Sequence, residues 1–174
     1  YTLWVIQCCI INSMINAQPY ISFVIPVYNE EGNVAQLHQE ILQVAQSLKK
    51  PFEIIFVDDG SQDDTLKTLK QLKPIGILSL RRNSGQSAAL DAGFKAAQGE
   101  IIISLDGDGQ NDPADVPLLI EKLKHGYDVV CGWRHKRKDN ASRKFISMGA
   151  RVMRSFLVRD GIHDAGCTLR VYKK

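Results

Sequence analysis

Residues 21–27 read ISFVIPV, and residues 52–57 read FEIIFV. Both runs are short and almost continuously apolar, which is typical of parallel strands that are buried on both faces. The segment between them predicts a helix from about residue 32, with apolar side chains at spacings of three and four residues: Leu37, Ile41, Val44 and Leu48. A strand, a helix and a second strand joined by short links indicate a βαβ unit, so this stretch predicts an α/β fold.

The alternation of strand and helix continues along the chain. Further strands are predicted at residues 75–80, 101–105 and 128–131, and further helices at residues 65–72, 84–98 and 113–124. The last helix is expected to turn three side chains inward: Leu118, Leu119 and Leu123. The pattern predicts a Rossmann-like, mainly parallel sheet with helices on both faces, whose ligands bind beyond the carboxyl ends of the strands.

The composition limits the class of protein. With 174 residues, 44% of them hydrophobic and 24% charged, the chain is expected to form one globular α/β domain. No apolar run reaches the roughly 18 to 20 residues that span a bilayer, which argues against a polytopic membrane protein. The four cysteines show no paired metal-ligand spacing, so a reducing cytosolic compartment is predicted.

The two ends of the chain are interpreted differently from its middle. Residues 1–20 form an apolar extension without a basic flank, for which a membrane-contacting helix is the alternative. Beyond Cys131 a basic loop at residues 133–139 leads into a predicted helix at residues 142–158. The chain stops at residues 172–174 without a helix-ending signal, so we expect it to be truncated at its carboxyl end.

The formal net charge of +3 divides unevenly along the sequence. Residues 1–133 carry 10 basic and 16 acidic side chains, a net charge of −6, whereas residues 134–174 carry 12 basic and 3 acidic ones, a net charge of +9. An acidic body followed by a basic tail predicts two surfaces with different binding partners.

Acidic side chains follow two of the predicted strands. Asp58 and Asp59 end the second strand, and residues 106–110 after the fourth strand read DGDGQ. One Asp-Gly pair is an ordinary turn, but two clusters at the ends of separate parallel strands favour a binding site. Crowded carboxylates need a cation between them, and Mg²⁺ and Mn²⁺ prefer oxygen ligands. We therefore predict a divalent metal site whose protein oxygens come from three residues: Asp106, Asp108 and Gln110.

Two common phosphate-binding motifs are absent from the sequence. It contains neither Gly-x-Gly-x-x-Gly after a strand nor Gly-x-x-x-x-Gly-Lys-Ser/Thr. This disfavours a dinucleotide-dependent dehydrogenase and a P-loop NTPase. A diphosphate is then expected to be held through a metal ion and side chains.

These motifs resemble, in order and spacing, the family 2 glycosyltransferases of the GT-A fold. Besides DGDGQ, the matching stretches are PVYNEE at residues 26–31, VDDGS at 57–61, GWR at 132–134 and HDAGCTLR at 163–170. Within the family the chain is most similar to dolichol-phosphate mannose synthase and the bacterial undecaprenyl-phosphate glycosyltransferases. The resemblance implies a catalytic domain at residues 21–174. Gly107 and Gly109 depart from the bulkier residues expected there, and Ala165 stands where an aromatic residue is usual.

The resemblance also implies site residues. Pro26, Tyr28 and Glu30 would line the nucleoside pocket, and Asp58 and Asp59 would contact the base and ribose of a nucleotide-sugar donor. A structural interpretation remains open for two of them: Tyr28 as a packing residue at a strand end, and Glu30 as a carboxylate stabilised by a helix dipole.

The basic tail supplies candidates for the acceptor side of the reaction. Arg134 follows the fifth strand, so it is expected at the same sheet edge, where a guanidinium can bind two phosphate oxygens or stabilise a departing diphosphate. Arg143 and Lys144 could hold the phosphate of a lipid acceptor. An acceptor phosphate is already anionic and needs no general base. The other basic side chains would attract an anionic membrane at its cytoplasmic face, and nucleic acid is not expected as a partner.

Other functions remain open from the sequence alone. A sugar hydroxyl as acceptor would require a general base, for which Asp164 is the candidate. A non-catalytic nucleotide-sugar-binding module is a further possibility. A nucleotidyltransferase is less favoured, because it needs a glycine-rich, basic loop after the first strand, where this chain is acidic.

Overall fold

The computed structural model describes residues 18–132 and 167–174. The chain divides into a larger unit, Tyr1–Cys131 with Thr168–Lys174, and a smaller unit, Gly132–Cys167. Nearly all described residues belong to the larger unit.

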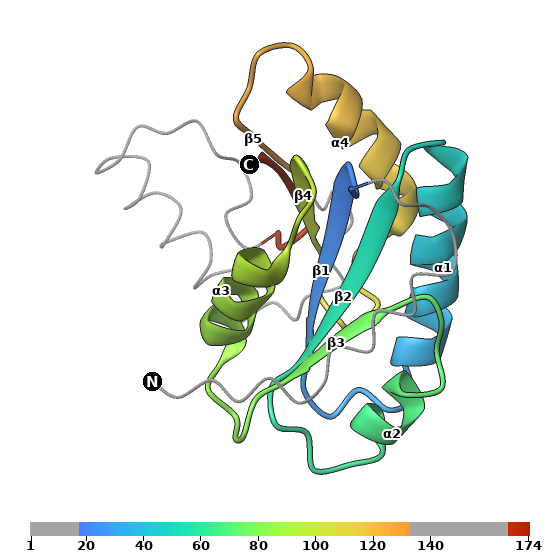
Figure 1. Cartoon of the computed structure of the whole chain (residues 1–174), viewed down its shortest axis with the longest axis vertical. Coiled ribbons are helices and arrows are strands. Elements are labelled where there is room, and N and C mark those ends of the chain that lie inside the picture. The colour runs from blue at the N-terminus through green and yellow to red at the C-terminus, as the bar shows by residue number, and fades with distance from the viewer. Residues whose placement is uncertain (1–17, 133–166) are drawn as a thin grey trace, which may run out of the picture. The chain divides into compact units, whose positions relative to one another are not determined.

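A single sheet of six strands forms the centre of this unit within the described residues (Figure 1). The strands are β1 (Ile21–Val27), β2 (Phe52–Asp58), β3 (Gly76–Ser79), β4 (Ile101–Ser104), β5 (Val129–Cys131) and β6 (Arg170–Lys173). Their spatial order is β3-β2-β1-β4-β6-β5. Strands β1 to β4 pair in parallel, whereas β6 is antiparallel to both of its neighbours. The mainly parallel α/β sheet predicted from the sequence is confirmed.

The strand β6 is absent from the sequence prediction. Residues 170–173 read RVYK, which is too short and too charged to form a recognisable apolar run. Its strand geometry comes from pairing on both sides, Val171 with Ile103 of β4 and with Val130 of β5. Long-range pairing of this kind leaves little trace in local sequence.

The helices agree with the predicted ones in place but are shorter at their ends. They are α1 (Val34–Ser47), α2 (Thr65–Leu69), α3 (Gln86–Ala96) and α4 (Val116–Leu123), the last preceded by the 3-10 turn η1 (Pro113–Asp115). The inward orientation predicted for Leu118 is wrong, because this side chain is 66% exposed. The buried stripe of α4 follows the 3.6-residue period from the true start of the helix and consists of Val116, Leu119, Ile120 and Leu123.

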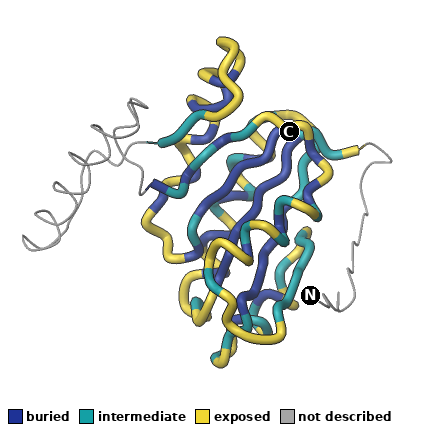
Figure 2. The backbone as a smooth tube through the Cα atoms, turned by 90° about the vertical axis from the view of Figure 1, so that its left-hand side faces the viewer, coloured by how far each residue is buried: buried dark blue, intermediate teal, exposed yellow. Residues whose placement is uncertain are grey.

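Helices cover both faces of the sheet. Figure 1 shows α3 on one side and α1 with α4 on the other. Alternate strand residues face alternate sides, so Val24 and Val57 pack in a cluster with Ala89 of α3. Gly93 allows this close packing, since a Cβ atom there would lie 2.3 Å from Cγ1 of Val24. Figure 2 shows the strands mostly buried and the connecting loops mostly exposed.

None of the helices in the described residues is long and apolar enough to cross a membrane.

Candidate active site

Segments that follow β1, β2 and β4 line one cavity at the carboxyl edge of the sheet. In the parallel register Val27 pairs with Asp58, and Val24 pairs with Ser104, so the chain passes the same sheet edge three times. The cavity has a volume of about 340 Å³. Its lining includes six of the predicted site residues: Pro26, Tyr28, Glu30, Asp59, Asp106 and Asp108.

Asp58 is buried next to the cavity and holds the loop after β2 in place. Its side chain is buried, with 1% exposed, and does not line the cavity. One carboxylate oxygen accepts the backbone N–H of Ser61 at 3.0 Å, and the other accepts the hydroxyl of Ser79 at 3.1 Å. Asp58 thus fixes the turn after β2 and joins it to the end of β3. Its predicted contact with a nucleotide stays a prediction.

Asp59 forms part of the cavity wall and orients the loop opposite it. This carboxylate is 3% exposed and accepts two backbone N–H groups, from Ser84 at 2.8 Å and from Gly85 at 2.9 Å. Gly85 precedes α3 and has φ of 89°, a conformation that favours glycine. Asp59 therefore fixes the approach of the chain to the first turn of α3.

The loop that carries Tyr28 and Glu30 is held by the loop after β2. The backbone N–H of Asn29 donates to the Ser61 hydroxyl at 3.0 Å, and that of Glu30 donates to the Thr65 hydroxyl at 2.8 Å. These bonds fix the backbone without using the Tyr28 ring, which remains 38% exposed at the cavity. An aromatic ring that lines a cavity and stays partly exposed is available for stacking on a planar ligand.

Asp106 is held by side chains from two other parts of the chain. Oδ1 accepts Nε2–H of Gln86, the first residue of α3, at 2.5 Å, and Oδ2 accepts the hydroxyl of Thr168. Thr168 in turn accepts a hydrogen bond from Nδ2 of Asn111 at 3.0 Å. The Asp106 carboxylate is therefore fixed between α3 and the segment that leads into β6.

Asp108 and Gln110 lie in the exposed part of the same turn. The Asp108 carboxylate accepts the backbone N–H of Gln110 at 3.0 Å, and both residues are exposed. Asp108 lines the cavity, whereas Gln110 is not among its lining residues. Gly107 brings this turn against β1, because a Cβ atom there would lie 2.6 Å from Cγ1 of Val27. This contact explains why glycine stands at position 107.

Comparison with known proteins identifies the family. The family model described as glycosyl transferase family 2 matches residues 22–174. The chain belongs to glycosyl transferase family 2. It is 40% identical over 161 residues to the undecaprenyl-phosphate 4-deoxy-4-formamido-L-arabinose transferase of Pseudomonas paraeruginosa, covering 88% of this chain and 47% of that protein. It is also 40% identical over 166 residues to the enzyme of the same name from Pectobacterium atrosepticum, covering 92% and 51%.

Solved structures establish the fold of this family 2 chain. Glucosyl-3-phosphoglycerate synthase from Mycobacterium tuberculosis, solved with Mn²⁺, UDP-glucose and phosphoglyceric acid, superposes with a TM-score of 0.72 at 21% identity, covering 89% of this chain and 57% of that one. The same synthase with Mn²⁺, UDP and glucosyl-3-phosphoglycerate gives 0.71. The predicted GT-A fold is confirmed. The chain spans about half the length of the curated relatives that it matches.

The donor atoms at the cavity fit a divalent ion that arrives with a nucleotide. The described residues hold no cluster of three His, Cys, Asp or Glu side chains placed to bind a metal by themselves. However, Mg²⁺ and Mn²⁺ commonly bind through only one or two carboxylates, with phosphate and water oxygens as the other ligands. Asp106 and Asp108 supply carboxylates of this kind on the cavity wall.

Four predicted residues of the acceptor side lie outside the described part of the chain: Arg134, Arg143, Lys144 and Asp164. Their roles toward an acceptor phosphate or as a catalytic base stay predictions. Residues 1–17, most of the predicted N-terminal extension, also lie outside it.

The structure adds cavity residues that the sequence motifs did not identify. Asn83, Gly85 and Gln86 line the cavity from the loop after β3 and the start of α3. The rule that ligands bind beyond the strand ends would have indicated this loop, because β3 is parallel to β2. Thr168 belongs to the HDAGCTLR stretch, but the rule gave no reason to place it beside Asp106, since it precedes a strand of opposite direction that was not predicted.

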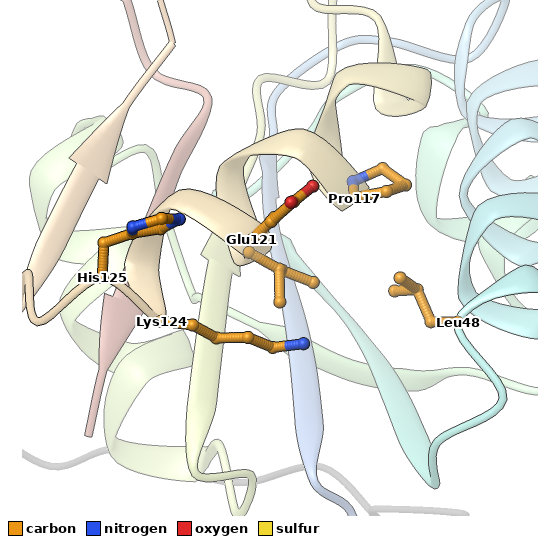
Figure 3. A pocket seen from close by; sticks show the side chains of 6 residues that line it. Leu48, Pro117, Glu121, Lys124 and His125 are labelled. Carbon is orange, nitrogen blue, oxygen red and sulfur yellow. The ribbon is translucent and has the colours of Figure 1, made fainter.

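A larger hollow of about 500 Å³ lies elsewhere on the same unit (Figure 3). It is lined by Leu48, after α1, and by residues of α4 and the segment that follows, including Glu121 and His125. Leu48 and His125 lie shortly before β2 and β5, which places the hollow toward the amino ends of these strands. It contains none of the predicted site residues, so the smaller cavity is the better candidate for chemistry.

Proposed function

We propose that this protein is an inverting glycosyltransferase that moves a sugar from a UDP- or GDP-sugar to a polyprenyl phosphate at the cytoplasmic face of a membrane. The observation that carries the proposal is the convergence of six donor-side residues, predicted from separate motifs, on one cavity. The relatives named as undecaprenyl-phosphate transferases support the acceptor class.

The donor nucleotide would occupy the part of the cavity formed by β1 and β2. The exposed ring of Tyr28 offers a face on which a base can stack, and Pro26 closes the adjacent wall. Glu30 and Asp59 offer carboxylate oxygens to ribose hydroxyls. Asp58 would act indirectly, because its side chain is buried and does not line the cavity, whereas Asp59 does.

The diphosphate would lie beside the turn after β4. There Asp106, Asp108 and Gln110 would hold a Mg²⁺ or Mn²⁺ ion. When bound, such an ion neutralises negative charge that develops on a departing diphosphate. Without a cation, Asp106 and Asp108 would repel the diphosphate, so donor binding is expected to require the metal.

The transfer would be a single displacement at the anomeric carbon. A phosphate oxygen of the acceptor forms the new bond, the bond to the nucleoside diphosphate breaks with its electron pair, and the configuration inverts. Arg134 would stabilise the leaving diphosphate, and Arg143 with Lys144 would place the acceptor phosphate. Basic residues of the tail would bring the protein to an anionic membrane surface.

A donor screen tests this function. Purified protein is incubated with individual UDP- and GDP-sugars, Mn²⁺ or Mg²⁺, and a short polyprenyl phosphate, and products are identified by mass spectrometry. We expect a glycosyl polyprenyl phosphate from at least one donor, formed only with metal present. A product from a polysaccharide or glycolipid acceptor and none from polyprenyl phosphate would instead support a hydroxyl acceptor, and Asp164→Asn should then abolish transfer.

A further inference from the structure

Each oxygen of the Asp106 carboxylate accepts a hydrogen bond from a residue distant in the sequence, and we call these two hydrogen bonds clamps. Gln86 donates to one oxygen from the start of α3, 20 residues before Asp106, and Thr168 donates to the other from 62 residues beyond it. Asp108 lies two residues further along the same turn, and within residues 18–132 and 167–174 it accepts a hydrogen bond only from the neighbouring backbone N–H of Gln110.

Thr168 is itself oriented by two hydrogen bonds. Its backbone carbonyl accepts the hydroxyl of Ser104, the last residue of β4, at 2.7 Å. Its own hydroxyl accepts Nδ2–H of Asn111 at 3.0 Å. A hydroxyl has a single proton, so a Thr168 hydroxyl that accepts from Asn111 directs that proton to Asp106. The result is a directed chain from Asn111 through Thr168 to Asp106.

We propose that Thr168 and Gln86 are positioning residues that hold the Asp106 carboxylate in the orientation needed to bind the metal and diphosphate of the donor. The inference rests on the proposed function and adds to it a role for two residues outside the acidic motif. Groups that hydrogen-bond a ligating carboxylate fix its direction, and their loss typically lowers metal affinity about 10- to 100-fold.

The two clamps are expected to differ in strength. Thr168 is partly buried and is fixed by Ser104 and Asn111, whereas Gln86 is exposed at a helix start. A fixed hydroxyl keeps its geometry when the carboxylate moves, while an exposed amide side chain can follow it. Loss of the Thr168 hydroxyl should therefore weaken metal binding more than loss of the Gln86 amide.

The test measures Mn²⁺ binding directly, by electron paramagnetic resonance of free Mn²⁺ in the presence of UDP. Thr168→Val removes the hydroxyl but keeps the branched shape, Thr168→Ser retains the hydroxyl, and Gln86→Leu removes the second clamp. Thr68→Val, in α2, is the matched control away from the cavity. We expect Mn²⁺ affinity to fall about tenfold in Thr168→Val and less in Gln86→Leu. Thr168→Ser should restore most of it, and Thr68→Val should match the unmodified protein.

Steady-state kinetics supply a second readout. Thr168→Val should raise the KM for donor, and saturating Mn²⁺ should recover much of the loss. Unchanged Mn²⁺ affinity in Thr168→Val and Gln86→Leu, with the unmodified protein binding Mn²⁺ and transferring sugar, would overturn the inference and leave the proposed function intact. Should Thr168→Val not fold, equal affinities of Gln86→Leu and the unmodified protein would count against the clamp. An unmodified protein that neither binds Mn²⁺ with UDP nor transfers sugar would overturn both proposals.

Discussion

The carboxylates at the end of β2 and those after β4 differ in burial and in how many hydrogen bonds they accept from the protein. Asp58 and Asp59 are 1% and 3% exposed, and all four of their oxygens accept hydrogen bonds, three from loop backbone N–H groups and one from the hydroxyl of Ser79 at the end of β3. Asp108 is exposed and accepts one local backbone N–H. Asp106 lies between these extremes, because side chains from other elements hold it. We infer that the first pair mainly shapes the cavity, with Asp59 also reaching the donor, and that the second pair binds the metal and diphosphate.

Asp108→Ala should produce the largest effect and should affect chemistry alone. Asp108 would hold the ion that stabilises the leaving diphosphate, and loss of a group that stabilises developing charge typically costs about 10²- to 10³-fold in kcat. Because Asp108 is exposed, the free energy of unfolding should change by no more than about 0.5 kcal/mol. Transfer rates and urea denaturation of the same preparation check both parts. Full activity in this variant would contradict the role of Asp108 as a metal ligand.

Asp59→Asn should instead act mainly on stability, by lowering the free energy of unfolding. An amide keeps the size of the side chain, but its NH₂ group cannot accept the second of the two backbone N–H groups. An unsatisfied buried donor costs about 1–3 kcal/mol, so we expect a loss of about 2 kcal/mol in the free energy of unfolding. Asp115→Asn, at an exposed position, is the control and should be near neutral. Equal stability of the two variants would contradict a structural role for Asp59.

Glycines in the two acidic turns allow a matched comparison. Gly60 and Gly109 have φ of 73° and 70°, so alanine is strained at both, by about 1–2 kcal/mol. A Cβ atom at Gly60 would also lie 2.6 Å from the carbonyl carbon of Arg82, whereas at Gly109 nothing lies within 4 Å. Gly60→Ala should therefore destabilise by at least about 1 kcal/mol more than Gly109→Ala. Thermal and urea unfolding of both variants measure the difference in stability. Equal losses of stability would show that the turn at Gly60 is no more tightly packed than the turn at Gly109.

The smallest expected effect concerns Asp63, in the segment after β2, and the stability of the fold at acid pH. Desolvation raises the pKa of the Asp63 carboxyl, but hydrogen bonds from the Thr65 hydroxyl and from the backbone N–H groups of Thr65 and Glu31 outweigh it, so the pKa lies below the ordinary value of 3.8. A carboxyl with a lowered pKa stabilises the fold above its ordinary value, and this contribution is lost as the pH falls through the folded pKa. Asp63→Asn should thus be less stable than the unmodified protein at pH 7, and the difference should shrink below about pH 3.8. A difference independent of pH would contradict this assignment.

The sequence predicted those parts of the fold that depend on local pattern. The runs around Val24 and Ile55 are continuously apolar because both faces of their strands are covered, so the parallel strands were recognisable. The strand β6 was not recognisable, because its pairing with β4 and β5 is set by contacts remote in sequence. Leu118 was misplaced because it is apolar and adjacent to Leu119, although the buried stripe of α4 consists of Val116, Leu119, Ile120 and Leu123.

The candidate site was predictable where its residues follow parallel strands. Asp59, Asp106 and Asp108 were placed on one edge by the fold rule alone, and the structure brings them to one cavity. The sequence could not distinguish a buried, fully bonded Asp58 from an exposed Asp108, since both stand beside a glycine or another aspartate in a turn. Nor could it place Thr168 against Asp106, because that contact exists only once β6 inserts beside β4.

The most direct test of the proposed function is the choice between an acceptor phosphate and an acceptor hydroxyl. With the active nucleotide sugar and metal, release of nucleoside diphosphate is measured with a polyprenyl phosphate and with the matching polyprenol as acceptors. We expect rapid release with the phosphate, a glycosyl polyprenyl phosphate of the expected mass, and no release above background with the alcohol. Release with the alcohol and none with the phosphate would contradict it.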